Sequence, residues 1–458
     1  MEWSVETLLT VHVSVLSALL VGVAVVLVRR RLFSWHTAGF WSWCTLVLYL
    51  VLNPLSSLVG GNLYFYRLYL LLGGGVERGL WILTVTLLGI GTFFVVYLCT
   101  SPGKLSLPRA SQTVSFPMVL AALPFVFFGL YSLLTQRAYV IEVGRAAVIE
   151  AGRFTGEVSG YENSGYLFLV VPILCLLMAS TREVRLWGWL TVGLFVWLTL
   201  PSGWSRFVPV SMLLAASLAE VVRRRVAWPR WFWASLIVAA ALMLQVRGHV
   251  RWSLADMGVE LLALGRQMVQ EGVGVLGRAV TSGEVSALAV WYFESFVIER
   301  YYGYSYGLPA LNYILTGWVP ARFFPQKYFL VDWLTQQRFY AGPLVESLLY
   351  GSKSTLLGSF YGDGGLPAVL ALSALTGFLA RRLDGMLQPE ASPLRHALGV
   401  AWMSMLWMVW QSSETWGIMT LGTVALPAIA MWAAGGGLRR ILSRMFTERH
   451  RWKPYRPI

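Results

Sequence analysis

The residues best suited to chemistry in this sequence lie between Arg300 and Pro367. The stretch opens with tyrosines around Gly303 and continues with cations that stand among further aromatic residues. Aromatic faces suit sugar rings, whose C–H surfaces stack on them, while guanidinium and ammonium groups bind anions. We therefore expect substrate contacts from Arg300, Arg322, Lys327, Arg338 and Lys353. The alternative is that the aromatic residues only form a membrane-interface belt.

Three arginines earlier in the chain are further candidates for anion binding, Arg206 as a catalytic residue and Arg145 and Arg153 as substrate contacts. Arg206 ends a turn over residues 201–206 that joins two apolar segments. Its forked donors would lie at headgroup depth, where a lipid phosphate or pyrophosphate is found; the alternative is an arginine that snorkels to the interface. Arg145 and Arg153 stand eight residues apart on a partly helical stretch, where they either bind substrate or pair with neighbouring glutamates.

Asp363 is the candidate catalytic carboxylate, and Tyr361 beside it is a candidate substrate contact. Asp363 lies slightly inside an apolar segment, where an ionisable group is costly and is therefore expected to be functional. A general base that deprotonates a sugar hydroxyl requires such a carboxylate or a histidine. Further carboxylates expected on the same side are Glu157, Glu162, Glu294, Glu299, Asp332 and Glu346. The histidines and carboxylates lack metal-ligand spacing, so we predict no metal and no cofactor.

These residues stand in a chain whose composition indicates a polytopic membrane protein. Its 458 residues are 57% hydrophobic and 13% charged, with a mean hydropathy of +0.62; soluble domains are about 25% charged. Segments of roughly 17–25 apolar residues can cross a bilayer. About eleven are expected, at 7–28, 36–59, 79–100, 116–134, 163–180, 186–201, 207–222, 231–246, 354–380, 394–411 and 416–436. The predicted fold class is an all-α transmembrane helix bundle.

The predicted organisation has four parts. Residues 1–246 hold eight transmembrane helices with a short outer loop at 135–162, and residues 247–353 form a large extracytoplasmic loop subdomain. Residues 354–436 hold three more helices, and residues 437–458 form a basic cytoplasmic tail that contacts membrane lipid. With the amino terminus outside and the carboxy terminus inside, the inner segments hold 21 of the 36 Lys and Arg residues, as the positive-inside rule requires. This distribution explains the net charge of +14 without a nucleic-acid partner.

The chain resembles the Wzy-type O-antigen or exopolysaccharide repeat-unit polymerases. The resemblance rests on the helix number with large outer loops, the Ser-Gly-x-Ser-Arg turn at 202–206, the Pro-x-Arg and Pro-x-Lys pair at 320–327, and the run at 354–365. It covers the central and carboxy-terminal parts, since the first hundred residues contribute only hydrophobicity.

The resemblance implies a glycosyltransferase of the bacterial inner membrane that joins undecaprenyl-pyrophosphate-linked repeat units at the outer face. The transfer would be inverting and metal-independent, with Arg206 on the donor pyrophosphate, helped by Arg145, Arg153 or Arg322. Asp363 or a loop carboxylate would orient or deprotonate the acceptor hydroxyl. A chain-length regulator and a flippase are the protein partners that the resemblance implies.

Two alternatives remain open in the sequence. The related O-antigen ligases have a histidine near the end of the large loop, and residues 340–357 contain none here, so a ligase is the second choice. A lipid-linked oligosaccharide flippase or another transporter would show internal repeats and mid-membrane polar residues. In this chain the charged residues instead concentrate at the outer interface and in one long loop.

Overall fold

The computed structural model describes residues 4–59, 63–72, 74–102, 115–143, 165–199, 207–226, 287–317, 326, 329, 355–388, 391–411 and 414–437, which form helices and turns without strands. The all-α prediction is thus confirmed for this part of the chain. The helices are α1 (Val5–Arg29), α2 (Ala38–Val47), α3 (Asn53–Val59), α4 (Tyr64–Leu72), α5 (Gly75–Cys99), α6 (Phe116–Val143), α9 (Val170–Leu177), α10 (Arg182–Thr199), α11 (Phe207–Arg224), α15 (Ala287–Val297), α16 (Leu308–Asn312), α19 (Leu356–Asp384), α20 (Pro393–Gln411) and α21 (Glu414–Trp432).

Within the described residues, five helical segments are long and apolar enough to cross a membrane. They are Val5–Arg29, Ala38–Val59, Gly75–Cys99, Phe116–Thr135 and Leu356–Leu387, with shorter apolar helices at Gly165–Leu177 and Thr420–Gly436. Helices α10, α11 and α20 also lie where apolar segments were predicted, whereas the predicted span 231–246 lies outside the described residues. The structure therefore supports a membrane protein, with five candidate crossings among the described residues.

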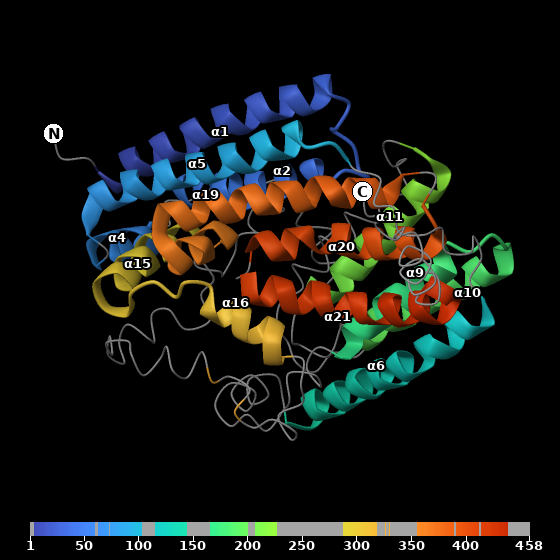
Figure 1. Ribbon diagram of the computed structural model, residues 1–458. Coiled ribbons are helices and arrows are strands. Elements are labelled where there is room, and N and C mark those ends of the chain that lie inside the picture. The colour runs from blue at the N-terminus through green and yellow to red at the C-terminus, as the bar shows by residue number, and fades with distance from the viewer. Residues whose placement is uncertain are drawn as a thin grey trace, which may run out of the picture.

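The helices are arranged as a bundle in which α1, α5 and α19 run side by side (Figure 1). Helix α20 is the central element, because it contacts α2, α9, α11, α19 and α21. Its residues Ala397, Val400, Ala401 and Met403 are fully buried, as expected for a helix that is apolar all round. Helix α15 falls inside the predicted loop at 247–353, yet it packs on α4, α5 and α19 as part of the bundle.

Helices α5 and α19 approach each other closely at two glycines. A Cβ atom on Gly377 of α19 would lie 2.4 Å from the carbonyl oxygen of Phe93. A Cβ atom on Gly89 of α5 would lie 2.9 Å from both Leu357 and Val369. Small residues allow two helices to approach this closely. Between helices in a membrane, association depends on such van der Waals packing, because lipid provides no hydrophobic driving force. The α5–α19 pair is thereby held in one register.

A buried carboxylate forms hydrogen bonds with several helices at one end of the α5–α19 pair. Asp384, the last residue of α19, accepts hydrogen bonds from the Tyr97 hydroxyl at 2.5 Å, the Arg381 guanidinium at 2.9 Å and the backbone N–H of Ala38 at 2.7 Å. The last bond caps α2, whose own N-cap residue, Thr37, makes no side-chain cap. Asp384 therefore joins the ends of α5 and α19 to the start of α2.

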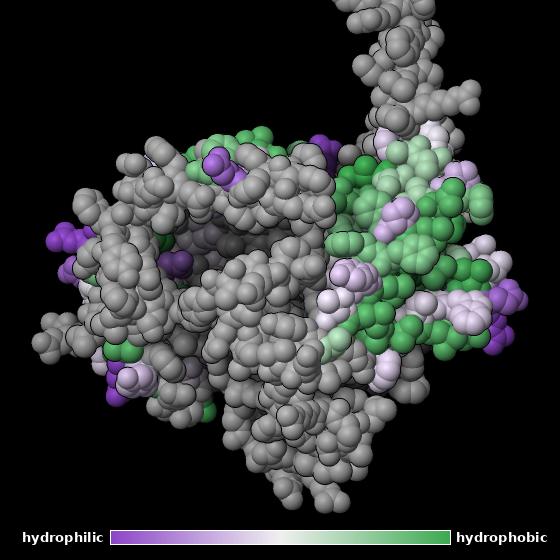
Figure 2. Space-filling model, turned by 90° about the horizontal axis from the view of Figure 1, so that it is seen from below, coloured by the Kyte–Doolittle hydropathy of each residue, from purple (hydrophilic) through white to green (hydrophobic). Residues whose placement is uncertain are grey.

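The exterior of the bundle is apolar along its helices. On α6, Phe116, Leu120, Phe127 and Tyr131 are 56–78% exposed, and their spacing places them on one helix face. Figure 2 shows hydrophobic side chains over this part of the surface. A contiguous apolar surface of this kind is expected to face lipid.

The described arginines concentrate at the end of the bundle where α1, α5 and α19 finish, on the right in Figure 1. They adjoin the ends of α1, α11 and α19 and the starts of α10 and α20: Arg29, Arg30, Arg31, Arg182, Arg185, Arg223, Arg224, Arg225, Arg381, Arg382 and Arg395. The helices and turns toward the other end hold Arg67, Arg78, Arg137 and Arg300. We call these the arginine-rich and arginine-poor ends.

We expect Asp384→Asn to destabilise the protein by about 3–5 kcal/mol, because it leaves the mostly buried Arg381 guanidinium without its charged partner. Tyr97→Phe removes only one hydrogen bond to a carboxylate and should cost less, about 1.5–3 kcal/mol. Thermal unfolding in detergent micelles measures both, with Glu183→Gln on an exposed residue at the start of α10 as the control. Equal melting temperatures for Asp384→Asn and the control would contradict this role of Asp384.

Candidate functional site

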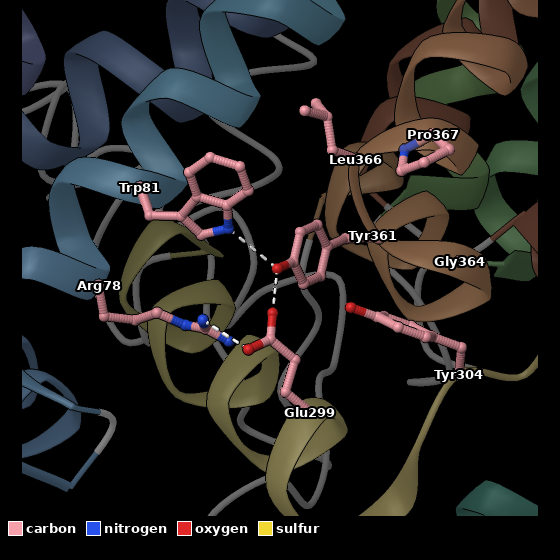
Figure 3. A pocket seen from close by; sticks show the side chains of 9 residues that line it. Arg78, Trp81, Glu299, Tyr304, Tyr361, Gly364, Leu366 and Pro367 are labelled. Carbon is pink, nitrogen blue, oxygen red and sulfur yellow. Dashed lines mark hydrogen bonds and ion pairs between the residues drawn. The ribbon is translucent and has the colours of Figure 1, made fainter.

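An open pocket of about 590 Å³ lies at the arginine-poor end, beside the starts of α5 and α19. This volume is within the range of small-molecule sites, about 300–1,000 Å³. Figure 3 shows its lining, which combines aromatic rings, one charged pair and a short stretch of irregular backbone. The lining residues are Arg78, Trp81, Glu299, Tyr304, Tyr361, Gly364, Gly365, Leu366 and Pro367.

The charged pair in the pocket is formed by Arg78 and Glu299. Arg78, in the first turn of α5, donates to Glu299 Oε2 at 2.8 Å, to the Ser295 hydroxyl at 3.1 Å and to the Ser295 carbonyl at 2.7 Å. Ser295 and Glu299 are four residues apart, on α15 and on the π-helical turn η3 (Ile298–Tyr302) that follows it. They therefore share a face, and one guanidinium reaches both. The Arg78 side chain is only 16% exposed, and that of Glu299 is 35% exposed.

Tyr361 connects this pair to the third helix of the pocket. The indole N–H of Trp81 donates to the Tyr361 hydroxyl at 3.0 Å, and that hydroxyl donates to Glu299 Oε1. Trp81 lies one turn after Arg78 on α5, while Tyr361 is in the first part of α19 and is 2% exposed. Because an indole N–H can only donate, it directs the single Tyr361 proton toward Glu299. The carboxylate thus receives one donor on each oxygen.

Tyr304 is held over the pocket by a short segment that Asp363 binds. The segment runs from Gly303 to Gly307, both of which have left-handed backbone angles. Asp363 Oδ1 accepts from the Ser305 hydroxyl at 2.6 Å and from the Gly307 N–H at 3.0 Å, and its carbonyl accepts from the Tyr306 N–H at 2.8 Å. The Ser305 N–H donates to the Gly362 carbonyl at 2.8 Å. We call this set of bonds the Asp363 latch.

The helix α19 is interrupted where it lines the pocket. Gly364 and Gly365 have non-helical backbone angles, and Pro367 follows in the next turn. Gly365 has φ +65° and ψ −151°, a region that only glycine occupies readily. A Cβ atom there would also lie 3.0 Å from the Tyr304 hydroxyl. Glycine is therefore required both by the backbone and by the approach of Tyr304.

The Tyr304 hydroxyl is a neutral hydrogen-bonding group in the pocket. Burial, followed by the negative charge of Glu299, raises the pKa of the Tyr304 phenol. Its ring packs edge-to-face on that of Tyr361, with centroids 6.3 Å apart. The pocket therefore presents a neutral donor, apolar ring faces and a carboxylate that is already paired with an arginine. This combination suits a polyhydroxylated ring.

The structure brings some of the predicted site residues together. Tyr361 lines the pocket, whereas Asp363 lies two residues further on, is 5% exposed and binds the 303–307 segment. Arg300 is exposed on η3 next to Glu299 and is not part of the pocket lining. The other predicted contacts lie outside the described residues: Arg145, Arg153, Arg206, Arg322, Lys327, Arg338 and Lys353.

The sequence did not predict that Arg78, Trp81, Glu299 and Tyr304 line one pocket. Glu299 was one of several outer carboxylates, and Tyr304 belongs to the aromatic stretch that begins at Arg300, so composition pointed to their neighbourhood. Arg78 and Glu299 are 221 residues apart, and only the packing of α15 on α5 brings them together. Among the described residues, no group of three or more His, Cys, Asp or Glu side chains could hold a metal ion.

No protein-family model, curated protein or solved structure matches this chain.

The Asp363 latch predicts different effects for two substitutions. Asp363→Asn keeps an oxygen that can accept from Ser305 and Gly307, so amide exchange over residues 304–307 should stay within about threefold of wild type. Asp363→Ala removes the acceptor, which leaves the Gly307 N–H unpaired, at about 1–3 kcal/mol, and leaves the Ser305 hydroxyl only its longer bond of 3.2 Å to the Gly362 carbonyl. Exchange should therefore rise by at least tenfold. Hydrogen–deuterium exchange mass spectrometry measures both, and equal exchange in the two variants would contradict the latch.

The interruption of α19 predicts that Gly365→Ala is destabilising. The left-handed angle alone costs of the order of 1–3 kcal/mol, and the added methyl group must displace Tyr304. Gly91→Ala on α5 is the matched control, since a Cβ atom there meets nothing within 4 Å, and alanine favours the helix by roughly 0.5–1 kcal/mol. The melting temperature should fall for Gly365→Ala and hold or rise for Gly91→Ala; the reverse order would show that Gly365 is not required.

Proposed function

We propose that this protein is a glycosyltransferase that polymerises undecaprenyl-pyrophosphate-linked oligosaccharide repeat units into a surface polysaccharide. The observation that supports it most is the open pocket at the arginine-poor end of an apolar helix bundle, with aromatic rings, a neutral phenol donor and a carboxylate. Such a lining suits a glycan presented at the surface of a membrane. The resemblance to Wzy-type polymerases supports the same reaction.

The proposed orientation places the arginine-rich end in the cytoplasm. Positive residues are retained on that side, and the described arginines gather where α1, α5 and α19 finish. The pocket then opens at the outer face of the bacterial inner membrane, with the amino terminus outside and the carboxy terminus inside. A bundle of about eleven crossings, the outer segments at 135–162 and 247–353 and the basic tail at 437–458 belong to the same proposal.

The proposed reaction is an inverting transfer with a polyprenyl pyrophosphate leaving group. The leaving group gains negative charge as its bond to the sugar breaks, and arginines can stabilise that charge without a metal ion. Arg206 is the proposed pyrophosphate ligand, with help from Arg145, Arg153 or Arg322. Of the described arginines at the pocket, Arg78 is paired with Glu299, which agrees with a pyrophosphate site formed by other residues.

Deletion of the gene in its native host tests this function. We expect the long surface polysaccharide to disappear while single repeat units still reach their terminal acceptor, because only polymerisation is lost. Gel electrophoresis of the surface glycan and mass spectrometry of the lipid extract measure the two products, and expression of the wild-type gene from a plasmid is the control.

Two other outcomes would overturn the proposal. Loss of all surface glycan, with repeat units left on their lipid carrier at the outer face, would indicate a ligase. The same loss with repeat units confined to the inner face would indicate a flippase. Polysaccharide of normal length in the deletion strain would exclude all three activities.

A further inference from the structure

We propose that the pocket is the subsite for the reacting sugar of the acceptor glycan, that this sugar is uncharged, and that Glu299 accepts the proton of its attacking hydroxyl. This assignment rests on the proposed function and extends it to a particular substrate and residue. The structure supports it through the charge balance of the pocket, the exposure of Glu299 and the direction of the hydrogen bonds around Tyr361.

The charge balance favours an uncharged ligand. The Arg78 guanidinium makes three hydrogen bonds, two to Ser295 and one to Glu299. The Glu299 carboxylate already balances the charge of Arg78, so an anionic sugar would meet Glu299 as a like charge with no unpaired cation among the described lining residues to offset it. The remaining lining consists of Trp81, Tyr304, Tyr361 and the apolar side chains that follow the break in α19. These rings can stack on a neutral sugar, and the Tyr304 hydroxyl can donate to it.

The same balance favours the acceptor over the donor. In the donor, the reacting carbon carries the pyrophosphate, so its subsite must hold cations that are free to bind phosphate oxygens. In the acceptor, the attacking hydroxyl is at the non-reducing end, remote from the pyrophosphate of its own lipid carrier. A sugar subsite whose arginine is already paired therefore fits the acceptor.

Glu299 is the carboxylate of the pocket that is open to a ligand. Its side chain is 35% exposed, whereas Asp363 is 5% exposed and binds the 303–307 segment. Each Glu299 oxygen receives one hydrogen bond, from Tyr361 on Oε1 and from Arg78 on Oε2. A carboxylate oxygen has two lone pairs, so each can accept a second hydrogen bond from a sugar hydroxyl. Trp81 and Tyr361 are positioning residues in this arrangement.

The step is balanced in atoms and charge. The acceptor hydroxyl loses its proton to Glu299, and its oxygen forms a bond with the anomeric carbon of the donor from the face opposite the leaving group. The bond between that carbon and the pyrophosphate oxygen breaks, and the electron pair leaves with the polyprenyl pyrophosphate. Glu299 then releases the proton to water.

The test uses the full-length protein in phospholipid nanodiscs, with the lipid-linked repeat unit as donor. The acceptor is a soluble repeat-unit oligosaccharide without lipid or pyrophosphate, which can act only as an acceptor. We expect Glu299→Gln to lower kcat by at least about 100-fold, the usual contribution of a general base, with KM for the oligosaccharide within about threefold. We expect Tyr304→Phe to raise that KM by roughly 2–12-fold, the loss of one hydrogen bond of about 0.5–1.5 kcal/mol.

Glu77→Gln is the matched control for Glu299→Gln, because Glu77 is an exposed residue in the first turn of α5 outside the pocket lining; both kinetic constants should be unchanged. A Glu299→Gln rate within threefold of wild type would overturn the assignment of Glu299 while leaving the polymerase function intact. Should Glu299→Gln fail to fold, the Tyr304→Phe KM decides the subsite, and an unchanged value would overturn it.

Two results with the wild-type protein are also decisive. Elongation of the lipid-linked unit but not of the soluble oligosaccharide would overturn recognition of the acceptor through its sugar. Elongation of neither substrate would overturn the polymerase function, and this assignment with it. Chemical analysis of the polymer adds a further check, since an acidic sugar at the attacking position would contradict an uncharged acceptor.

Discussion

The close contact between α5 and α19 is the constraint on which the rest of the described structure depends. It is set where the Gly377 backbone meets the Phe93 carbonyl and where Gly89 meets two apolar side chains. Because the two helices are in one register, their polar residues meet at both ends. Tyr97 reaches Asp384 at one end, and Trp81 reaches Tyr361 at the other. A shift of either helix by one turn, about 5.4 Å, would break both contacts.

The two polar clusters serve different purposes because their exposure differs. At the arginine-rich end, Asp384 is 8% exposed and is bonded to three elements at once. Loss of one partner from such a buried ion pair is strongly destabilising, because the other partner is left as an uncompensated buried charge. At the arginine-poor end, the break at Gly364 and Gly365 leaves a pocket open beside the Arg78–Glu299 pair. Irregular backbone at membrane depth is tolerated where it lines a cavity.

The sequence was sufficient to predict the long apolar helices and insufficient to predict α15 or the pocket. Long apolar runs with arginines at their ends predicted α1, α5 and α19, because length and hydropathy are local properties. Glu299 was also visible as one of the outer carboxylates, and Arg78 as a cation just before the apolar run that begins at residue 79. Their pairing was not, because it depends on how α15 packs against α5, and no local pattern encodes a contact between residues 221 positions apart. The order of the Trp81, Tyr361 and Glu299 hydrogen bonds likewise exists only after folding.

Asp363 and Glu299 differ in burial, and this difference separates a structural carboxylate from the one proposed to act as a base. A carboxylate within an apolar segment is expected to have a purpose, and Asp363 has one, since it fixes the segment that holds Tyr304. Proton transfer needs more, because the base must contact the hydroxyl that it deprotonates. Glu299 accepts a hydrogen bond on each carboxylate oxygen, and its side chain is also exposed in the pocket. Burial therefore identifies the residue that organises the site, and access identifies the residue that can react.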